Sequence, residues 1–222
     1  MKKKEIKSIL SPKQQGLLTL LSLNKTICKK FYLTGGTALA EFYLSHRLSE
    51  DLDFFSEEEF DPQSISIILK SMQKKGDIKT FDYEQSFNRN IYFLKTPKET
   101  IKSEFTYFPF TRIEKKQKFG NLSVDSLLDI AVNKIFTIYQ KPRSRDFIDL
   151  YFIIQKTSWT LDKLVKLARA KFDWHIDPIQ LGSQLLKAQE LKDYPRMIIA
   201  VKDSVWQNYF ITEAKKLEEE VF

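Results

Sequence analysis

Residues 34–56 read TGGTALAEFYLSHRLSEDLDFFS, and this segment decides the fold of the chain. It contains a glycine pair, Gly35-Gly36, then a stretch with helical spacing, and then the alternation of a strand around Asp51 and Asp53. Side chains two residues apart on a strand point to the same face, so the two acids should lie side by side. The segment therefore predicts a Gly-Gly turn, a helix and a strand that carries an acid pair.

An acid pair of this kind needs a cation. Two unit charges about 4 Å apart repel by about 4 kcal/mol at an effective dielectric of about 20. Carboxylate oxygens suit Mg2+ or Mn2+, which can also bridge to nucleotide phosphates. Gly35 and Gly36 let backbone N–H groups approach a phosphate at the start of the helix, where Thr37 adds a hydroxyl. A plain turn would explain the glycine pair alone, and a solvated strand edge would explain the acid pair alone. The occurrence of both in this order predicts a phosphate-binding bend beside a metal-binding pair, Asp51 and Asp53.

With these residues the segment resembles the AbiEii/AbiGii-type nucleotidyltransferase toxin family, which belongs to the polymerase β-like nucleotidyltransferase superfamily. The similarity rests on GGTALA at residues 35–40, on His46-Arg47 and on SEDLDFF at residues 49–55. A second stretch, NKIFTIYQKPRSRDFIDLYFI at residues 133–153, is similar to the family's second signature. Its matching residues are Lys134, Arg145, Asp146 and Asp149.

The resemblance implies a third carboxylate on a neighbouring strand. Alternation in residues 101–106, IKSEFT, places Lys102, Glu104 and Thr106 on one face. Glu104 is thus the candidate third metal ligand, or a general base for an acceptor hydroxyl. A solvated face with a Lys-Glu pair is the alternative, and Asp82 is the reserve candidate.

Lys134 lies at the margin of an apolar helical stripe, where a lysine either extends to water or reaches a phosphate. The resemblance favours nucleotide binding. Asp146 and Asp149 share one helix face, and the helix dipole alone would favour them there. The resemblance implies that they orient Lys134 or Arg145, or contact the acceptor.

The expected site comprises two overlapping sets of residues. The catalytic set is Asp51, Asp53, Glu104, Lys134 and Asp146, of which the first three bind metal. The nucleotide-binding set is Gly35, Gly36, Thr37, Arg47 and Lys134. Arg47 also has a structural explanation, as a cation near a helix C-terminus. His175 matches no functional pattern and is expected to be structural.

The fold class expected for the chain is α+β. Residues 1–120 should form a polymerase β-like nucleotidyltransferase core with a mixed sheet flanked by helices, and residues 121–222 a helical C-terminal region packed on that core. Strand-like runs fill residues 78–110. Helices are expected at residues 12–30, 62–75, 124–140, 145–155, 161–172, 178–187 and 198–219.

Composition sets the class of protein and its compartment. The 222 residues include 42% hydrophobic and 29% charged residues, which excludes a disordered or fibrous chain. No apolar run approaches the roughly 20 residues of a membrane span, and the lysine-rich start is not followed by a hydrophobic signal region. The single cysteine, Cys28, excludes an internal disulfide. We therefore expect a cytoplasmic protein without a membrane partner.

The formal charge of +7 has two possible interpretations. Basic clusters at residues 2–4, 29–30, 74–75, 115–118 and 141–145 attract polyanions, or they form an ordinary soluble surface.

Three functions are compatible with these patterns. The resemblance implies an Mg2+- or Mn2+-dependent enzyme that transfers a nucleoside monophosphate from an NTP to an acceptor hydroxyl, with RNA such as tRNA as acceptor. It would be the toxin of a bacterial toxin-antitoxin or abortive-infection system, with a cognate antitoxin as partner. The alternatives are a non-catalytic nucleotide- or RNA-binding module, and the same chemistry on a small molecule or a protein.

Overall fold

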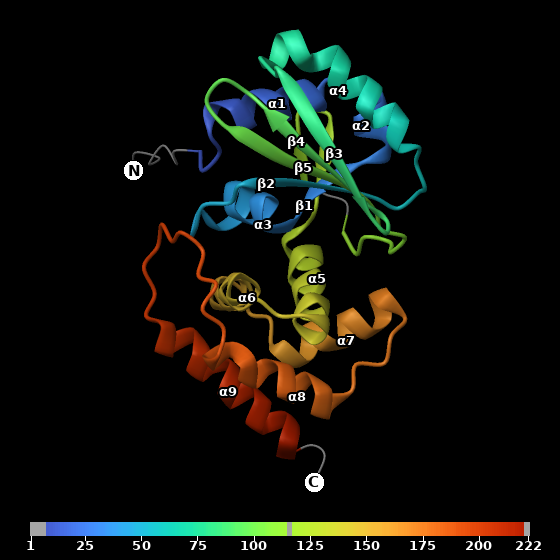
Figure 1. Ribbon diagram of the computed structural model, residues 1–222. Coiled ribbons are helices and arrows are strands. Elements are labelled where there is room, and N and C mark those ends of the chain that lie inside the picture. Colours follow the sequence, from blue (N-terminus) through green and yellow to red (C-terminus); the bar gives the residue numbers. More distant parts are fainter. Residues whose placement is uncertain (1–7, 115–116, 220–222) are drawn as a thin grey trace, which may run out of the picture. The chain divides into compact units, whose positions relative to one another are not determined.

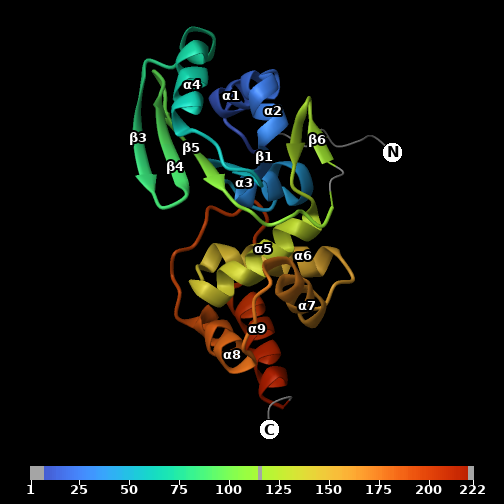
Figure 2. The ribbon, with the colours of Figure 1, turned by 90° about the vertical axis from the view of Figure 1, so that its right-hand side faces the viewer.

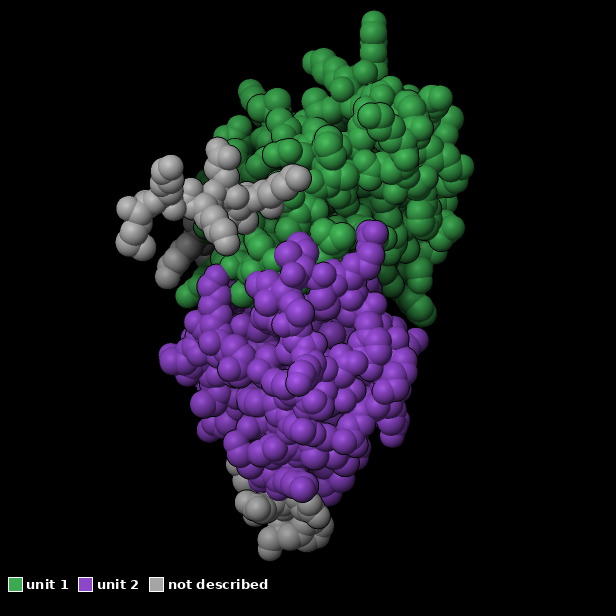
Figure 3. Space-filling model, turned by 90° about the vertical axis from the view of Figure 1, so that its left-hand side faces the viewer, with its two compact units in different colours: residues 1–126 green, residues 127–222 purple. Residues whose placement is uncertain are grey.

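The computed structural model describes residues 8–114 and 117–219 (Figure 1). The chain divides into two compact units, Met1–Ser126 and Leu127–Phe222, which Figure 3 colours green and purple. Within the described residues, no helix has both the length and the apolar character that a membrane span requires.

Unit 1 is built on a mixed sheet, which among the described residues has seven strands in the order β3-β4-β5-β2-β1-β7-β6. β2 runs parallel to β5 and antiparallel to β1, and β1 runs parallel to β7. The strands are β1 (Tyr32–Thr34), β2 (Asp51–Ser56), β3 (Thr80–Ser86), β4 (Arg89–Lys95), β5 (Thr100–Tyr107), β6 (Gln117–Phe119) and β7 (Leu122–Val124). This mixed sheet confirms the expected α+β class.

One face of this sheet forms the core of unit 1. Leu52 and Phe54 of β2 are fully buried there, and Phe54 stacks on Phe105 of β5 at 4.9 Å between ring centroids. Helices α1 (Pro12–Ser22), α2 (Lys25–Lys30) and α4 (Pro62–Gly76) lie on this side of the sheet (Figures 1 and 2). Helix α3 (Gly35–Leu39), continued by a π-helical segment (Ala40–Leu44), packs against β1 and β2 from the other side (Figure 2).

Two sequence expectations for unit 1 are wrong in detail. The single helix expected over residues 12–30 is two helices, because the Asn24 side chain accepts a hydrogen bond from the Ile27 amide at 3.0 Å and starts a new helix. A helix was expected from Val124, but Val124 ends β7. Gly120, with φ +57°, turns β6 back into β7, and this hairpin keeps the chain in unit 1 as far as Ser126.

Unit 2 consists mainly of helices in the part that the structure describes, with an irregular segment over residues 190–202. Its α-helices are α5 (Leu127–Gln140), α6 (Ser144–Lys156), α7 (Leu161–Phe172), α8 (Pro178–Leu186) and α9 (Asp203–Glu219). Phe147 of α6 packs against Trp206 and Phe210 of α9 in the core of the unit. The last helix begins later than expected, at Asp203 instead of residue 198.

Candidate active site

The acid pair lies on the face of the sheet opposite the core of unit 1. Asp51 and Asp53 alternate with the buried Leu52 and Phe54 along β2. In the parallel pairing of β2 with β5, Asp51 is opposite Lys102 and Asp53 is opposite Glu104. Strand partners at the same register share a face, so these four side chains lie together. This confirms the predicted alternation of residues 101–106.

The glycine bend lies against this acid pair. Gly35 has φ +71°, a conformation that glycine adopts without strain, and it follows Thr34, the strand partner of Asp53. A Cβ atom at Gly35 would overlap Asp53 Oδ2 and would lie 3.2 Å from Asp53 Cγ. A Cβ atom at Gly36 would overlap Arg47 Nη2. The fold therefore brings Gly35, Gly36, Arg47 and Asp53 into one place.

This close approach predicts the effect of a methyl group at the bend. Gly35→Ala should lower the free energy of unfolding by about 1–3 kcal/mol, because alanine is strained at positive φ and its methyl group displaces Asp53. Gly16→Ala is the matched control, since Gly16 is inside α1 and a Cβ there meets nothing within 4 Å. The control should gain up to about 1 kcal/mol. Calorimetric melting of both variants measures the difference, and equal melting would contradict the packing described.

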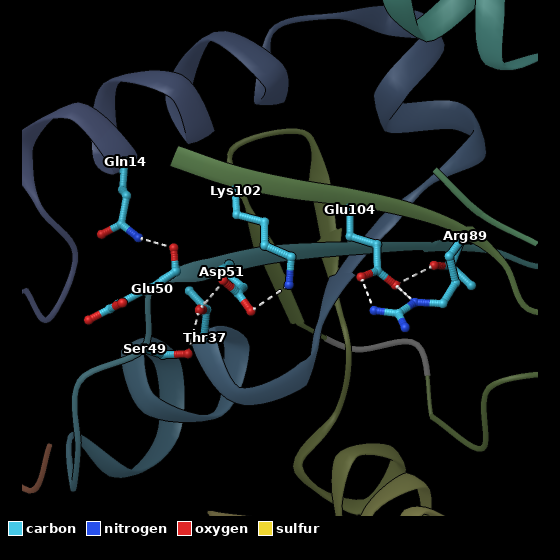
Figure 4. A network of polar contacts seen from close by, with 9 residues as sticks. Gln14, Thr37, Ser49, Glu50, Asp51, Arg89, Lys102 and Glu104 are labelled. Carbon is cyan, nitrogen blue, oxygen red and sulfur yellow. Dashed lines mark hydrogen bonds and ion pairs between the residues drawn. The ribbon is translucent and has the colours of Figure 1, made fainter. Parts of the chain in front are cut away.

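Thr37 links the start of α3 to β2. Its hydroxyl lies in a fully buried side chain and contacts the backbone oxygen of Asp51 and, at 2.8 Å, Ser49 Oγ (Figure 4). The sequence predicts a phosphate contact for this hydroxyl. The contacts to Asp51 and Ser49 hold the start of α3 against β2, and the phosphate contact stays a prediction.

Two cations lie among the acids (Figure 4). Lys102 Nζ is 3.0 Å from Asp51 Oδ2. Arg89 of β4 binds Glu104 through two bonds, Nε to Oε1 at 2.6 Å and Nη2 to Oε2 at 2.5 Å, and Thr106 Oγ1 donates to Glu104 Oε1 at 2.9 Å. Burial by itself raises the pKa of Glu104, but Arg89, Thr106 and Lys102 lower it by more. The pKa of Glu104 therefore lies below its usual value, and the carboxylate stays ionised at a lower pH than an ordinary glutamate.

The acid face offers oxygen donors for a metal ion. Asp51 and Asp53 provide hard oxygen donors on one face, and the charge they share draws Lys102 to Asp51. Among the residues that the structure describes, no group of three or more His, Cys, Asp or Glu side chains is arranged to hold a metal ion. Glu104 as third ligand stays a prediction. The reserve candidate Asp82 is exposed on the edge strand β3 and pairs with Lys95 at 2.6 Å.

Within unit 2, three residues of the second signature, Lys134, Asp146 and Asp149, form a cluster with Arg143. Lys134 Nζ is 2.6 Å from Asp146 Oδ1 and 2.7 Å from Asp149 Oδ2, and Arg143 Nε is 3.1 Å from Asp146 Oδ2. The lysine side chain is only 10% exposed, so it does not extend to water. Burial raises the pKa of Asp146, and the charges of Lys134 and Arg143 lower it by more. The two aspartates thus orient Lys134, whereas His175 lies exposed between α7 and α8.

Two residues of the acid face were not predicted as site residues. Lys102 could have been found, because strand alternation already placed it beside Glu104. Arg89 could not, because its place depends on the register of the β3–β4 hairpin and of β4 on β5.

Unit 1 combines a mixed sheet flanked by helices with an acid pair beside a Gly-Gly bend, the arrangement that the sequence predicts for a nucleotidyltransferase core. The crystal structure of JHP933 from Helicobacter pylori has a similar fold, with a TM-score of 0.60, 17% identity and coverage of 95% of this chain and 94% of that one. A second crystal structure from H. pylori also has a TM-score of 0.60, with 18% identity over 95% of this chain and 97% of its own.

The chain belongs to the AbiEii toxin family. The family model described as "Nucleotidyl transferase AbiEii toxin, Type IV TA system" matches residues 20–218. An uncharacterised protein of Aquifex aeolicus (strain VF5), aq_aa25, is 33% identical over 171 residues, which are 75% of this chain and 77% of that protein. Membership in a type IV toxin-antitoxin family implies a nucleotide substrate and a cognate antitoxin.

Proposed function

We propose that the chain transfers a nucleoside monophosphate from an NTP to an acceptor hydroxyl and that Asp51 and Asp53 hold a divalent ion, Mg2+ or Mn2+, for this reaction. The observation that carries the proposal is the contact of Gly35 with Asp53, which puts a bend suited to phosphate beside two carboxylates suited to metal. When bound, the ion supplies charge stabilisation at the reacting phosphate.

The chain's own residues have distinct parts in this proposal. Backbone N–H groups at Gly35 and Gly36, at the start of α3, bind phosphate oxygens. Arg47 lies against Gly36 and adds positive charge beside them. Lys102 pairs with Asp51, and its ammonium group would be available to the phosphates when a metal ion takes its place at that carboxylate.

Lys134 and Asp146 are proposed for the same reaction because they match the family's second signature. Their contacts support this: two carboxylates fix the ammonium group in one position, which suits a side chain that must meet a ligand in a defined geometry. Loss of Lys134 should therefore weaken nucleotide binding.

RNA, such as tRNA, is the acceptor that we propose, and the toxin is restrained by its cognate antitoxin. The formal charge of +7 supports a polyanionic acceptor. Basic clusters in the described part of the chain lie at residues 29–30, 74–75 and 141–145. Residues 2–4, 115 and 116 of the expected clusters lie outside the described residues.

A single labelling experiment tests this function. The purified chain is incubated with each of the four labelled NTPs, Mg2+ and total cellular RNA, and the labelled species are separated by size. We expect label in RNA from at least one NTP, and none after chelation of the metal. Binding of NTP without incorporation would support a non-catalytic binding module instead. Label in protein or in small molecules would show that the acceptor is not RNA, while the proposed nucleotidyl transfer would still stand.

A further inference from the structure

Arg89 lies on the face of the sheet that carries the acid pair, although it belongs to neither family signature. It is the first residue of β4 and the strand partner of Thr106. Thr106 shares its face of β5 with Glu104, which in turn is opposite Asp53 on β2. The register of three strands therefore brings a guanidinium group to the acids from a segment that precedes β5 in the chain.

Glu104 accepts three hydrogen bonds from Arg89 and Thr106 within unit 1. A guanidinium fork and a carboxylate match in plane and spacing, and the two bonds of 2.5 and 2.6 Å have that bidentate form. Thr106 Oγ1 supplies a further donor. The Glu104 side chain is only 7% exposed. These three bonds leave Glu104 Oε2 with one further acceptor position, and the bidentate pair holds the guanidinium in a fixed orientation.

Arg89, in contrast, keeps donors for a ligand. Its side chain is 48% exposed, and the bonds to Glu104 use Nε and Nη2 of a group that has five N–H donors. The hydrogen bond to Glu104 is the main reason that the pKa of Arg89 is raised, and the charges of Asp53 and Asp51 add to it. The guanidinium thus lies within electrostatic range of the acid pair.

The charges on this face suit a polyphosphate once a metal has bound. Asp51 and Glu104 each pair with a cation, Lys102 and Arg89 respectively. A divalent ion would add two positive charges to this face. Arginine binds phosphate with two parallel bonds, as it binds carboxylate.

We propose that Arg89 binds the phosphates of the NTP and that Glu104 acts as the positioning residue that holds Arg89 in place. This inference rests on the proposed nucleotidyl transfer and gives Glu104 a role other than metal ligand. Because Glu104 already fixes the orientation of Arg89, less side-chain entropy would be lost when the nucleotide binds.

Two binding measurements on the full chain test the proposal. Binding of each Mg2+–NTP is measured by calorimetry, and binding of Mn2+ alone by electron paramagnetic resonance. Arg89→Ala should raise Kd for the tightest NTP about 10- to 100-fold, as expected for charge-assisted bonds. Arg89→Lys should restore only part of the loss, because lysine lacks the fork. Mn2+ binding should stay within about threefold of wild type.

Glu104 is tested through its dependence on Arg89. Glu104→Gln should weaken NTP binding about 10-fold and leave Mn2+ binding unchanged. The double variant Arg89→Ala/Glu104→Gln should bind NTP no more weakly than Arg89→Ala alone, because Glu104 acts through Arg89. The double variant removes both charges of the pair and so avoids leaving one buried.

The control is Lys95→Ala. Lys95 lies on the same face of β4, six residues and about 20 Å from Arg89, and pairs with Asp82. The Lys95→Ala variant should bind NTP with the same affinity as the wild type.

Three results would overturn the inference: wild-type NTP affinity in Arg89→Ala, Mn2+ binding weakened 10-fold or more by Glu104→Gln, or no NTP binding by the wild type. The proposed function fails differently. If the wild type binds NTP but labels no acceptor, the proposed transfer reaction is refuted. The role of Arg89 in NTP binding is then still decided by the Kd values of the variants.

Discussion

Asp51→Asn and Asp53→Asn should each lower nucleotide transfer by at least about 100-fold, since even the loss of groups that only support a metal ligand costs 10- to 100-fold. Asparagine keeps the size of the side chain but removes the charge that draws a divalent ion to this face. Growth inhibition by the expressed toxin should disappear with the transfer reaction. The measurement is incorporation of labelled NTP into RNA under conditions where the wild type is active.

The fold should survive both substitutions. Asp51 is partly exposed and its ion pair with Lys102 is of the kind that contributes about 1 kcal/mol or less. Mn2+ binding separates a lost metal site from a lost fold: binding should disappear while the melting temperature changes by only a few degrees.

Asp77→Asn is the matched control for this change. Asp77 also pairs with a lysine, Lys13, at 2.7 Å, but it ends α4 with φ 53°, a conformation that asparagine tolerates well. Its transfer rate should equal that of the wild type. Undiminished transfer or toxicity in Asp51→Asn or Asp53→Asn would contradict the catalytic assignment.

The site could be predicted from the sequence as far as it is local. The acid pair, its strand and the glycine bend lie within 23 residues, and the alternation of β2 fixes which side chains share a face. Glu104 and Lys102 were placed on one face by the same rule. Their ion-pair partners, Asp51 and Arg89, could not be predicted by this rule, because the packing of the whole sheet decides which strands are neighbours.

The errors have related causes. β6 and β7 have three residues each, too short for a periodic signal, and their pairing with each other and with β1 determines where unit 1 ends. The burial of Thr37 depends on the path of residues 45–50 back to β2. Helical spacing alone could not show that Lys134 would meet both Asp146 and Asp149, although their common face on α6 made it one of the alternatives.

Lys134→Met should lower the free energy of unfolding of unit 2 by about 3–5 kcal/mol, the cost of removing one partner from a buried cluster of ion pairs. Asp146 and Asp149 are 1% and 0% exposed, so neither can turn to water when the ammonium is lost. All three tryptophans of the chain, Trp159, Trp174 and Trp206, lie in unit 2. Urea unfolding followed by tryptophan fluorescence therefore reports this unit.

The control for this substitution is Lys166→Met. Lys166 pairs with Asp162 on the surface of α7, with both side chains at least 60% exposed, and its loss should change stability by no more than about 0.5 kcal/mol. Lys134→Arg, which keeps the charge, should recover part of the loss. Equal stability of Lys134→Met and Lys166→Met would show that the buried cluster does not stabilise unit 2.

The pH dependence of the same signal identifies the cause. The pKa of Asp146 in the folded chain is lowered mainly by Lys134 and Arg143, against the effect of burial. A carboxyl group with a lowered pKa stabilises the fold above the pKa of the unfolded chain, about 3.9 for aspartate, and this stabilisation is lost as pH falls through the lower, folded value. Wild-type unit 2 should thus lose stability steeply below about pH 4. In Lys134→Met the main charge that lowers this pKa is gone, so that acid-induced loss should be smaller even though the variant is less stable at neutral pH.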